Sequence, residues 1–473
     1  MVYRNIKIQC LLLFIFSFLR ITAFSQSYTL SMRGAIDTAM NNYAIIQAKK
    51  NYVNAGEAQV QYSKLQAIPD LTISAQNNYG TINNIYGPGF SLGINGTGGL
   101  NSTGPMLASQ NWNAAYGGLY LASINWDFYS FGKIRAGIKA AQSDLKNKAS
   151  DLNQEIFEDK IKVCAAYLNL LGAQQLTKVA TDNLNRATAV KNAVVPRVLS
   201  GLNPGVDSSL AVAEVSNAKM AMIRAKDNEI QLANYLIQYL GIRDTSEPFL
   251  DTMFITRIPS NFLDSSIQYG PSHPLLQFYN SKIDQSRAQE KYIKTQYYPT
   301  FKFFSTYQSR ASGFGSGYSS TDLDDYTTNY WKGVGRTRQN YLVGIGMVWD
   351  LSTPFRLRKQ LLSQQMTTSG LRNEYARVDQ QLNSQVALAN AKVKNALVNY
   401  KEVPTELNAA NQAFIQKTTL YKNGLNTIID VTQALYAINK AETDKYIAFN
   451  NVWQALLLKA ASTGDFDIFL NEF

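Results

Sequence analysis

Two kinds of hydrophobic pattern alternate along this chain. The stretch DLTIS, residues 70–74, places Leu71 and Ile73 on one side and polar residues on the other, the period-two pattern of a strand with one apolar face. A segment after Pro299, PTFKFF, is also expected to be extended. The alternation returns in two further segments, at Tyr120, Ala122, Ile124, Trp126 and Phe128 and at Tyr341, Val343, Ile345, Met347, Trp349 and Leu351. The chain is therefore predicted to contain four strands.

Long segments with few turn signals separate these strands and are predicted to be helical. Residues 30–67 are rich in Ala and Gln, and Pro69 ends the segment. From about residue 129 to 200 there are few Gly or Pro residues, and some 70 helical residues would form a rod of roughly 105 Å. Pro196 is expected to kink or break this helix. A further helix should run to Gly241.

The whole plan occurs twice. Pro69 matches Pro299 at an offset of 230, whereas Trp126 matches Trp349 and Gly241 matches Gly464 at an offset of 223. The sequence thus divides into a first repeat at 26–241, a connecting segment at 242–271, a second repeat at 272–464 and a tail at 465–473. Matched lengths in both repeats indicate rigid elements that must end at the same height.

The same turn closes the helical part of each repeat, as GLNPGVD at 201–207 and GLNTIID at 424–430. Gly201 and Gly424 suit the left-handed residue that follows a helix. Asp207 and Asp430 suit the N-cap of the next helix, where a carboxylate accepts backbone N–H groups. Gln433, three residues after Asp430, would complete a capping box.

Composition narrows the class of protein. Residues 1–25 combine a basic start, a short apolar core and small residues before Gln26, the pattern of a secretory signal peptide. The net charge of +11 comes from scattered basic residues without long runs, which argues against nucleic-acid binding. Beyond residue 25 only Cys164 and one histidine, His273, remain, so neither a metal site nor Cys–His catalysis is expected. No cofactor is predicted.

One face of the predicted strands is apolar and aromatic, as in strands that face lipid. The residues expected to face lipid are Tyr120, Ile124, Trp126, Phe128, Tyr341, Val343, Ile345, Met347 and Trp349. Four strands cannot close a barrel, since about eight are needed even for one filled with side chains. Three copies would supply twelve strands. The alternative is a soluble four-stranded sheet.

Taken in order, these motifs resemble the TolC-type outer-membrane efflux proteins. The resemblance rests on the repeat, on the junctions AIPDLTIS and YYPTFKFF, on the strand exits INWDF and MVWDL, and on the two turns. It implies a mixed α+β membrane protein that forms a homotrimer, with a twelve-stranded β-barrel in the outer-membrane lipid. Long helical hairpins would form a periplasmic tunnel, opened by a periplasmic adaptor (membrane fusion) protein and an inner-membrane pump.

The resemblance also assigns a gate at the tunnel tip, formed by the two turns with Gly201, Asn203, Asp207, Tyr421, Gly424, Asn426, Asp430 and Gln433. Tyr421 and Asp430 match the gate tyrosine and one ring aspartate of the family, and Asp207 matches the aspartate that bonds the tyrosine. The family's gate arginine falls at Asn426 and a second ring aspartate at Gln433. We therefore expect a gate held differently, with a modest cation preference.

The leading hypothesis is a passive exit duct of a tripartite efflux or type I secretion system. An exported helical stalk or adhesin is the alternative. An exported hydrolase is disfavoured because a Ser–His triad would depend on His273 alone. The loops at 80–117 and 310–338 are the expected sites of surface variation, and the sequence does not reveal the cargo.

Overall fold

The computed structural model describes residues 29–83, 106–243, 248–259, 270, 272–335 and 338–473. The signal peptide expected at 1–25 lies outside these residues. The chain forms two compact units: a helical unit of Met1–Tyr52, Lys148–Asn280 and Asn373–Phe473, and a sheet unit of Val53–Asn147 and Ser281–Arg372. Each unit combines segments from both sequence repeats.

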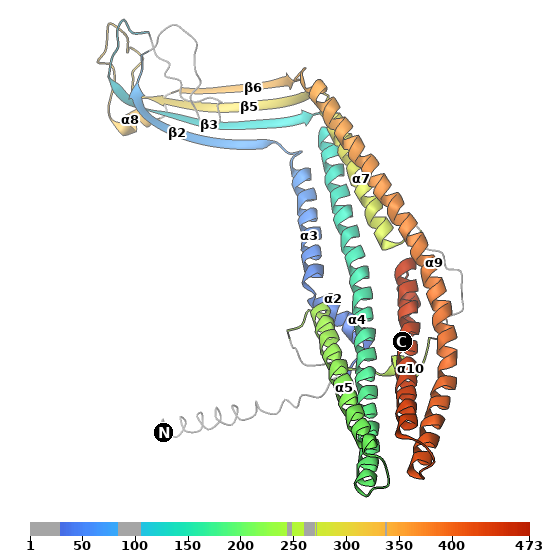
Figure 1. Ribbon diagram of the computed structural model, residues 1–473. Coiled ribbons are helices and arrows are strands. Elements are labelled where there is room, and N and C mark those ends of the chain that lie inside the picture. Colours follow the sequence, from blue (N-terminus) through green and yellow to red (C-terminus); the bar gives the residue numbers. More distant parts are fainter. Residues whose placement is uncertain (1–28, 84–105, 244–247, 260–269, 271, 336–337) are drawn as a thin grey trace, which may run out of the picture. The chain divides into compact units, whose positions relative to one another are not determined.

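An antiparallel four-stranded sheet dominates the sheet unit (Figure 1). Its strands, in spatial order, are β2 (Asp70–Thr81), β3 (Ala114–Tyr129), β5 (Thr300–Ser312) and β6 (Arg338–Val348). The four predicted strands are thereby confirmed. Among the described residues, β2 and β6 each pair with a neighbour on one side only, so both outer edges of the sheet are open there.

Strand register places the predicted apolar positions on one face. Leu71 lies opposite Ile124, which lies opposite Ser305, and Ser305 lies opposite Val343. We call this side the apolar face. A register shift between Trp126 and Tyr129 removes Phe128 from the row, and Tyr129 instead lies opposite Phe301. Trp349 lies one residue beyond β6.

Polar residues occupy most of the other face of the sheet. Lys302 of β5 forms an ion pair of 3.2 Å with Asp127 of β3 across the strands. Leu121, Leu342, Val348 and Phe304 are apolar residues on this face, and the ring of Phe304 lies against Gly344 of β6. A Cβ at position 344 would be 2.6 Å from Cζ of Phe304, so the contact depends on glycine.

The helix expected over residues 30–67 is in fact two helices, α2 (Met32–Asn42) and α3 (Ala44–Leu65). Tyr43 between them is extended, with φ −68° and ψ 119°. Gly241 packs so closely on this joint that a Cβ there would be 2.8 Å from the carbonyl oxygen of Asn42. The uninterrupted helical pattern was a misleading signal because tertiary packing, and not local propensity, breaks the helix.

Long helices supply the rest of both units: α4 (Lys133–Leu199), α5 (Gly205–Leu240), α7 (Pro274–Thr295), α9 (Thr353–Lys422) and α10 (Ile428–Thr463). The break expected at Pro196 is wrong, since α4 continues through it to Leu199. Pro196 stands in the last turn, where its missing N–H costs one bond and few residues remain to be bent. The end of α5 before a left-handed Gly241, at φ 66°, is as predicted.

The core of the helical unit gathers α2, α4, α5 and α10 around fully buried Trp453, Tyr167 and Phe469. Part of the connecting segment packs here. Strand β4 (Phe249–Leu250) pairs in parallel with β1 (Thr29–Leu30), a two-stranded sheet that was not expected. The short helix α6 (Met253–Thr256) brings Phe254 edge-on to Trp453 at 4.8 Å, and α11 (Asp467–Leu470) brings Phe469 to the same indole at 6.1 Å.

Two residues considered for chemistry also lie in this unit. Cys164 is completely buried, and burial raises the pKa of its thiol, which keeps it protonated. His273 is 3% exposed with its Nε2 3.1 Å from the carbonyl oxygen of Ala461, and burial lowers the pKa of its ring. Within the described residues, no helix has both the length and the apolar character to cross a membrane.

Candidate functional site

The two repeated turns have the same backbone geometry. Gly201 and Gly424 are left-handed, with φ 76° and 75°. In the first turn the N–H of Leu202 donates to the carbonyl of Arg197 at 2.9 Å, and in the second Leu425 donates to Leu420 at 2.9 Å. These are Schellman closures, in which a left-handed glycine satisfies the last helical carbonyls. The left-handed conformation predicted for both glycines is confirmed.

The predicted N-caps are wrong in both turns. Helix α10 begins after Thr427, whose Oγ1 accepts from the N–H of Asp430, while the carboxylate of Asp430 accepts from the N–H of Thr427. The capping box is therefore Thr427–Asp430, and Gln433 is an exposed residue outside it. Helix α5 begins after Pro204, whose side chain has no oxygen that could accept a capping hydrogen bond. Both aspartates are third residues of their helices, where their negative charge is still stabilised by the positive end of the helix dipole.

Asp207 is consequently free to bond across the hairpins. The hydroxyl of Tyr421, at the end of α9, donates to Oδ2 of Asp207 at 3.2 Å. The amide of Asn203 donates to the same Oδ2 at 2.9 Å and to the Tyr421 hydroxyl at 3.1 Å. Because Asp207 and Asn203 belong to the α4–α5 hairpin, this triad joins it to the α9–α10 hairpin.

The triad is shielded from water. Tyr421 is 4% exposed and Asp207 8%. Val194, Ala211, Ile428 and Val431 form an apolar cluster with Tyr421. Burial, followed by the neighbouring Asp207, raises the pKa of Tyr421 to about 12, so its hydroxyl remains a donor at neutral pH.

Arg197 extends this network and was missed by sequence analysis. Its Nε donates to Oδ1 of Asn203 at 3.1 Å, and its Nη1 donates to the backbone carbonyl of Lys422 at 2.9 Å. The guanidinium in the last turn of α4 thus holds the first turn's asparagine and the end of α9 together. We refer to Arg197, Asn203, Asp207, Tyr421 and the Lys422 carbonyl as the tip network.

The remaining predicted tip residues lie outside the network. Oδ1 of Asn426 accepts from the N–H of Thr427 at 3.0 Å, a contact within its own turn. Asp430 is bonded by Thr427 and by Nζ of Lys417 at 2.9 Å, and these bonds lower its pKa. Its charge is therefore paired within the α9–α10 hairpin.

A second bridge between the hairpins was also not foreseen. Arg186 of α4 forms a bidentate pair with Glu442 of α10, with N–O distances of 3.0 and 2.6 Å. Side-chain exposures of 21% and 24% make this a partly shielded pair. Nothing in the sequence signals it, because the partners lie 256 residues apart.

Apolar side chains remain exposed at both turns. Leu202 is 71% exposed and Leu425, its counterpart in the repeat, is 73% exposed. Leu199 and Ile429 beside them are 82% and 65% exposed. Exposed apolar residues grouped at one structural feature are typical of interaction surfaces.

Of the residues expected to face lipid, those on β6 are the most exposed. Tyr341, Val343, Ile345 and Met347 are 82%, 58%, 69% and 55% exposed, respectively. Tyr120 is half-buried, and its hydroxyl donates to Oδ1 of Asn77 at 2.8 Å and to the carbonyl of Val334 in helix α8 (Tyr330–Val334) at 3.2 Å.

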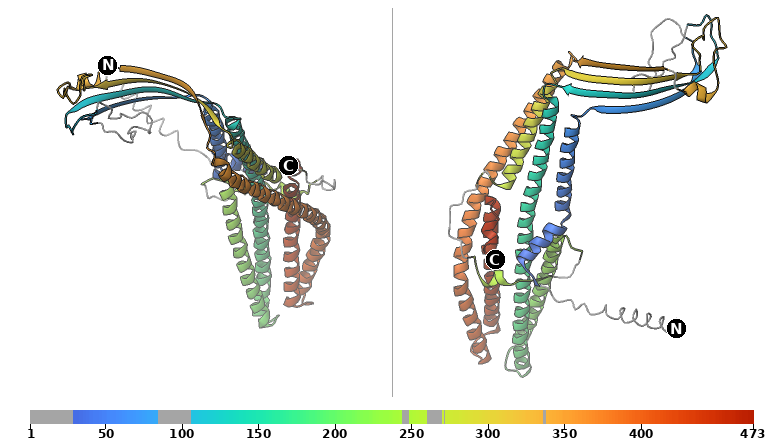
Figure 2. Two further views of the ribbon diagram at one scale, coloured as in Figure 1. Left: turned by 90° about the horizontal axis from the view of Figure 1, so that it is seen from above. Right: turned by 180° about the vertical axis from the view of Figure 1, so that it is seen from behind.

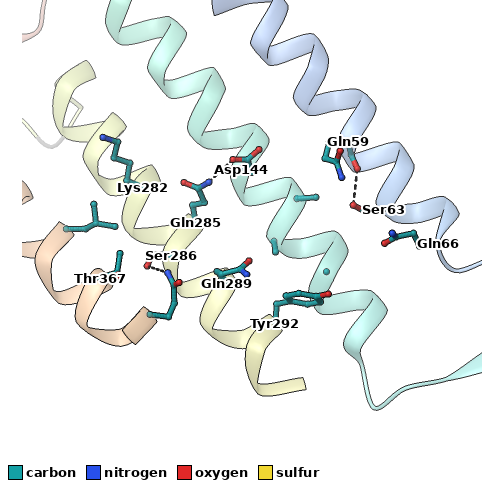
Figure 3. Close-up of a pocket in the computed structure, with 15 residues that line it drawn as sticks. Gln59, Ser63, Gln66, Asp144, Lys282, Gln285, Ser286, Gln289, Tyr292 and Thr367 are labelled. Carbon is teal, nitrogen blue, oxygen red and sulfur yellow. Dashed lines mark hydrogen bonds between the residues drawn. The ribbon is translucent and has the colours of Figure 1, made fainter. Parts of the chain in front are cut away.

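A polar cavity of about 710 Å³ lies between α3, α4, α7 and α9 in the sheet unit (Figure 3). Amide and hydroxyl groups dominate its wall, including a bond of 2.6 Å from Gln285 to Asp144 and one of 2.7 Å from Gln364 to Ser286. This composition fits a wetted surface. Within the described ranges, no three His, Cys, Asp or Glu side chains are grouped to hold a metal ion.

Comparison with known proteins identifies the class. The model of the outer membrane efflux protein family matches residues 35–242 and 272–458, so the chain belongs to this family and carries its motif twice. No curated protein sequence matches the chain.

Solved structures with the same fold include outer-membrane proteins and outer-membrane channels. The outer membrane protein VceC from Vibrio cholerae has 16% identity and a TM-score of 0.70, covering 92% of this chain and 96% of VceC. The CmeC outer membrane channel of Campylobacter jejuni has 14% identity and a TM-score of 0.69, with 92% and 86% covered. The open state of the MtrE channel of Neisseria gonorrhoeae has 15% identity and a TM-score of 0.67, with 92% and 88% covered.

Proposed function

We propose that three copies of this chain form a passive exit duct through the outer membrane, closed at its periplasmic end by the tip network. The supporting observation is the open-edged sheet. Strands β2 and β6 run in opposite directions, so β6 of one copy can pair with β2 of the next and continue the antiparallel order. Unpaired strand edges are otherwise a liability that folded proteins cover.

Three copies would close a twelve-stranded barrel. The apolar face would then lie toward lipid, while the face with Lys302 and Asp127 would line the interior. Barrels with more than about eight strands leave room inside for a channel. The inward position of this charged pair agrees with the cost of placing charged groups in hydrocarbon.

The tip network would serve as the closing device. It ties the two hairpins of one chain through a buried hydrogen bond from Tyr421 to Asp207 and an exposed one from Arg197 to the Lys422 carbonyl. A partner that moves α9 and α10 away from α4 and α5 must break the bonds of Tyr421 and Arg197 together. Buried bonds to charged groups are each worth roughly 1.5–3 kcal/mol, so the closed state would be populated at rest without external energy.

Opening would require partners. The exposed Leu202 and Leu425 offer the apolar contacts with which a periplasmic adaptor protein could engage both turns. An inner-membrane pump would supply the energy for opening. Small molecules or an unfolded polypeptide would be the cargo.

The proposal is tested by measuring the oligomeric mass and the planar-bilayer conductance of one detergent-extracted sample. A trimer with uniform, low-conductance openings would support a duct that is closed at rest. A monomer without conductance would contradict the proposal and favour the stalk.

A further inference from the structure

A basic groove lies between α4 and α7 within the sheet unit. It has a volume of about 700 Å³. Its cationic lining comprises Arg135, Lys139, Lys146, Arg287 and Lys291, all exposed, with Asp284 as the one acidic residue. Asp284 lies 3.3 Å from Lys146 and 3.9 Å from Arg287. Among the described residues, Arg135, Lys139 and Lys291 make no ion pair, so the groove carries an uncompensated positive charge.

An aromatic cluster adjoins one end of this groove. Phe131, in a left-handed backbone with φ 46°, stacks on Tyr298 at 5.3 Å and lies 4.8 Å from Tyr129. Phe301 is 6.4 Å from the Phe131 ring and faces the same side of the sheet as Ile345. A depression formed with these aromatics shares Arg135 and Lys139 with the groove. The cations therefore follow directly on the apolar face.

Most of the groove's cations have no basic counterpart at the equivalent positions of the other repeat. At the repeat offset of 223, Arg135 corresponds to Arg358, but Lys139 corresponds to Leu362. At the offset of 230, Lys291 corresponds to Gln61 of α3, and Arg287 to Glu57. The polar cavity of Figure 3 uses other residues of α4 and α7 and is dominated by neutral groups. A general excess of lysine does not explain such a one-sided distribution.

We propose that the groove binds the phosphate of an anionic phospholipid from the bilayer leaflet nearest α4 and α7. The inference rests on the proposed function, in which the apolar face lies in lipid. Aromatic side chains favour the boundary between hydrocarbon and head groups. Lysine and arginine just beyond that boundary bind anionic head groups. The three unpaired cations supply the charge complementarity, and the acyl chains would follow the apolar face.

The test compares lipid binding by the purified full-length protein in detergent, using phosphatidylglycerol and phosphatidylcholine with identical acyl chains. Bound lipid per chain is counted by native mass spectrometry. The variant carries Arg135→Gln, Lys139→Gln and Lys291→Gln. Its matched control is Arg358→Gln, which removes the equivalent charge from the other repeat. Each cation near a membrane surface contributes about a fivefold preference for anionic lipid.

We expect wild type and the control to prefer phosphatidylglycerol, and the triple variant to lose this preference by up to about 100-fold at low salt. Equal binding of both lipids by wild type, or an unchanged preference in the triple variant, would overturn the inference. Displacement of the lipid by millimolar glycerol phosphate would identify a free-phosphate site and would also overturn it. Conductance of the same samples separates the outcomes, since a failed duct abolishes conductance in every variant.

Discussion

Tyr421→Phe removes one hydroxyl from the centre of the tip network. The ring still fits its apolar cluster with Val194 and Ile428, so the helices should keep their packing. The hydroxyl bonds to Asp207 at 3.2 Å and Asn203 at 3.1 Å are lost. The perturbation is therefore confined to the polar tie between the hairpins.

The expected magnitude follows from burial and charge. A buried hydrogen bond to a carboxylate contributes roughly 1.5–3 kcal/mol, and among the described residues the carboxylate of Asp207 keeps the Asn203 donor after the change. A loss of about 2 kcal/mol per chain shifts the closed-to-open ratio about 30-fold, and three chains opening together would shift it by about 3 × 10⁴. Concerted opening thus predicts long open periods where wild type shows brief ones.

The pKa of Tyr421 determines how the stability of the closed state depends on pH. The pKa of Tyr421 is raised from 10.0 to about 12, so its contribution is fully present below pH 10 and is lost as pH rises through 12. The contribution of Tyr421 to the wild-type closed state should therefore stay constant from about pH 6 to about pH 9. Tyr421→Phe should raise the open probability throughout that range.

Single-channel recording in planar bilayers is the assay, and Tyr436→Phe is the matched control. Tyr436 lies on α10 and is 69% exposed, so its substitution by Phe removes the same hydroxyl group outside the network. We expect the control to behave as wild type. The reasoning is refuted if Tyr421→Phe leaves open probability unchanged, or if Tyr436→Phe raises it equally.

Three further changes test other parts of the structure. Asp159 is 1% exposed, and burial raises its pKa to about 6. The protonated side chain therefore stabilises the fold below pH 3.8, and this contribution is lost as the pH rises through 6. Asp159→Asn should raise the Tm at pH 7.5 but not at pH 3.5, and the gain in unfolding free energy should be at most about 3 kcal/mol. A double-mutant cycle of Arg186→Met and Glu442→Gln, followed by thermal unfolding, should show a coupling of about 1 kcal/mol, and additive effects would mean that the pair contributes nothing. Lys417→Gln should increase the cation preference of the channel in reversal-potential measurements because it leaves Asp430 unpaired, and an unchanged reversal potential would place Asp430 away from the ion path.

Local patterns predicted the strands and the shape of the turns. Alternation determines which strand residues share a face, and the register that aligns Leu71, Ile124 and Val343 agrees with it. Gly201 and Gly424 were predictable because a left-handed residue after a helix strongly favours glycine. The repeat also predicted that the two turns are equivalent, because similar sequences at matching positions of both repeats are not expected by chance.

Features that depend on distant residues were not predictable. Arg197 bonds a backbone carbonyl that lies 225 residues away, and a carbonyl leaves no trace in sequence. The break at Tyr43 depends on its contact with the α5 terminus. The cap at Thr427 could not be predicted from the repeat, because the corresponding residue of the first turn is Pro204 whereas the aspartate is common to both turns. The basic groove has no local sequence pattern because its residues come from α4 in the first repeat and α7 in the second.

The most direct test of the central claim is the conductance of the trimer when both ties of the tip network are removed. Tyr421→Phe combined with Arg197→Met eliminates the hydroxyl bonds and the bond to the Lys422 carbonyl, while Arg224→Met, an exposed change on α5, serves as control. We predict that the double variant opens stably to a larger uniform conductance and that the control remains like wild type. A double variant with the same low conductance as wild type would contradict closure by the tip network.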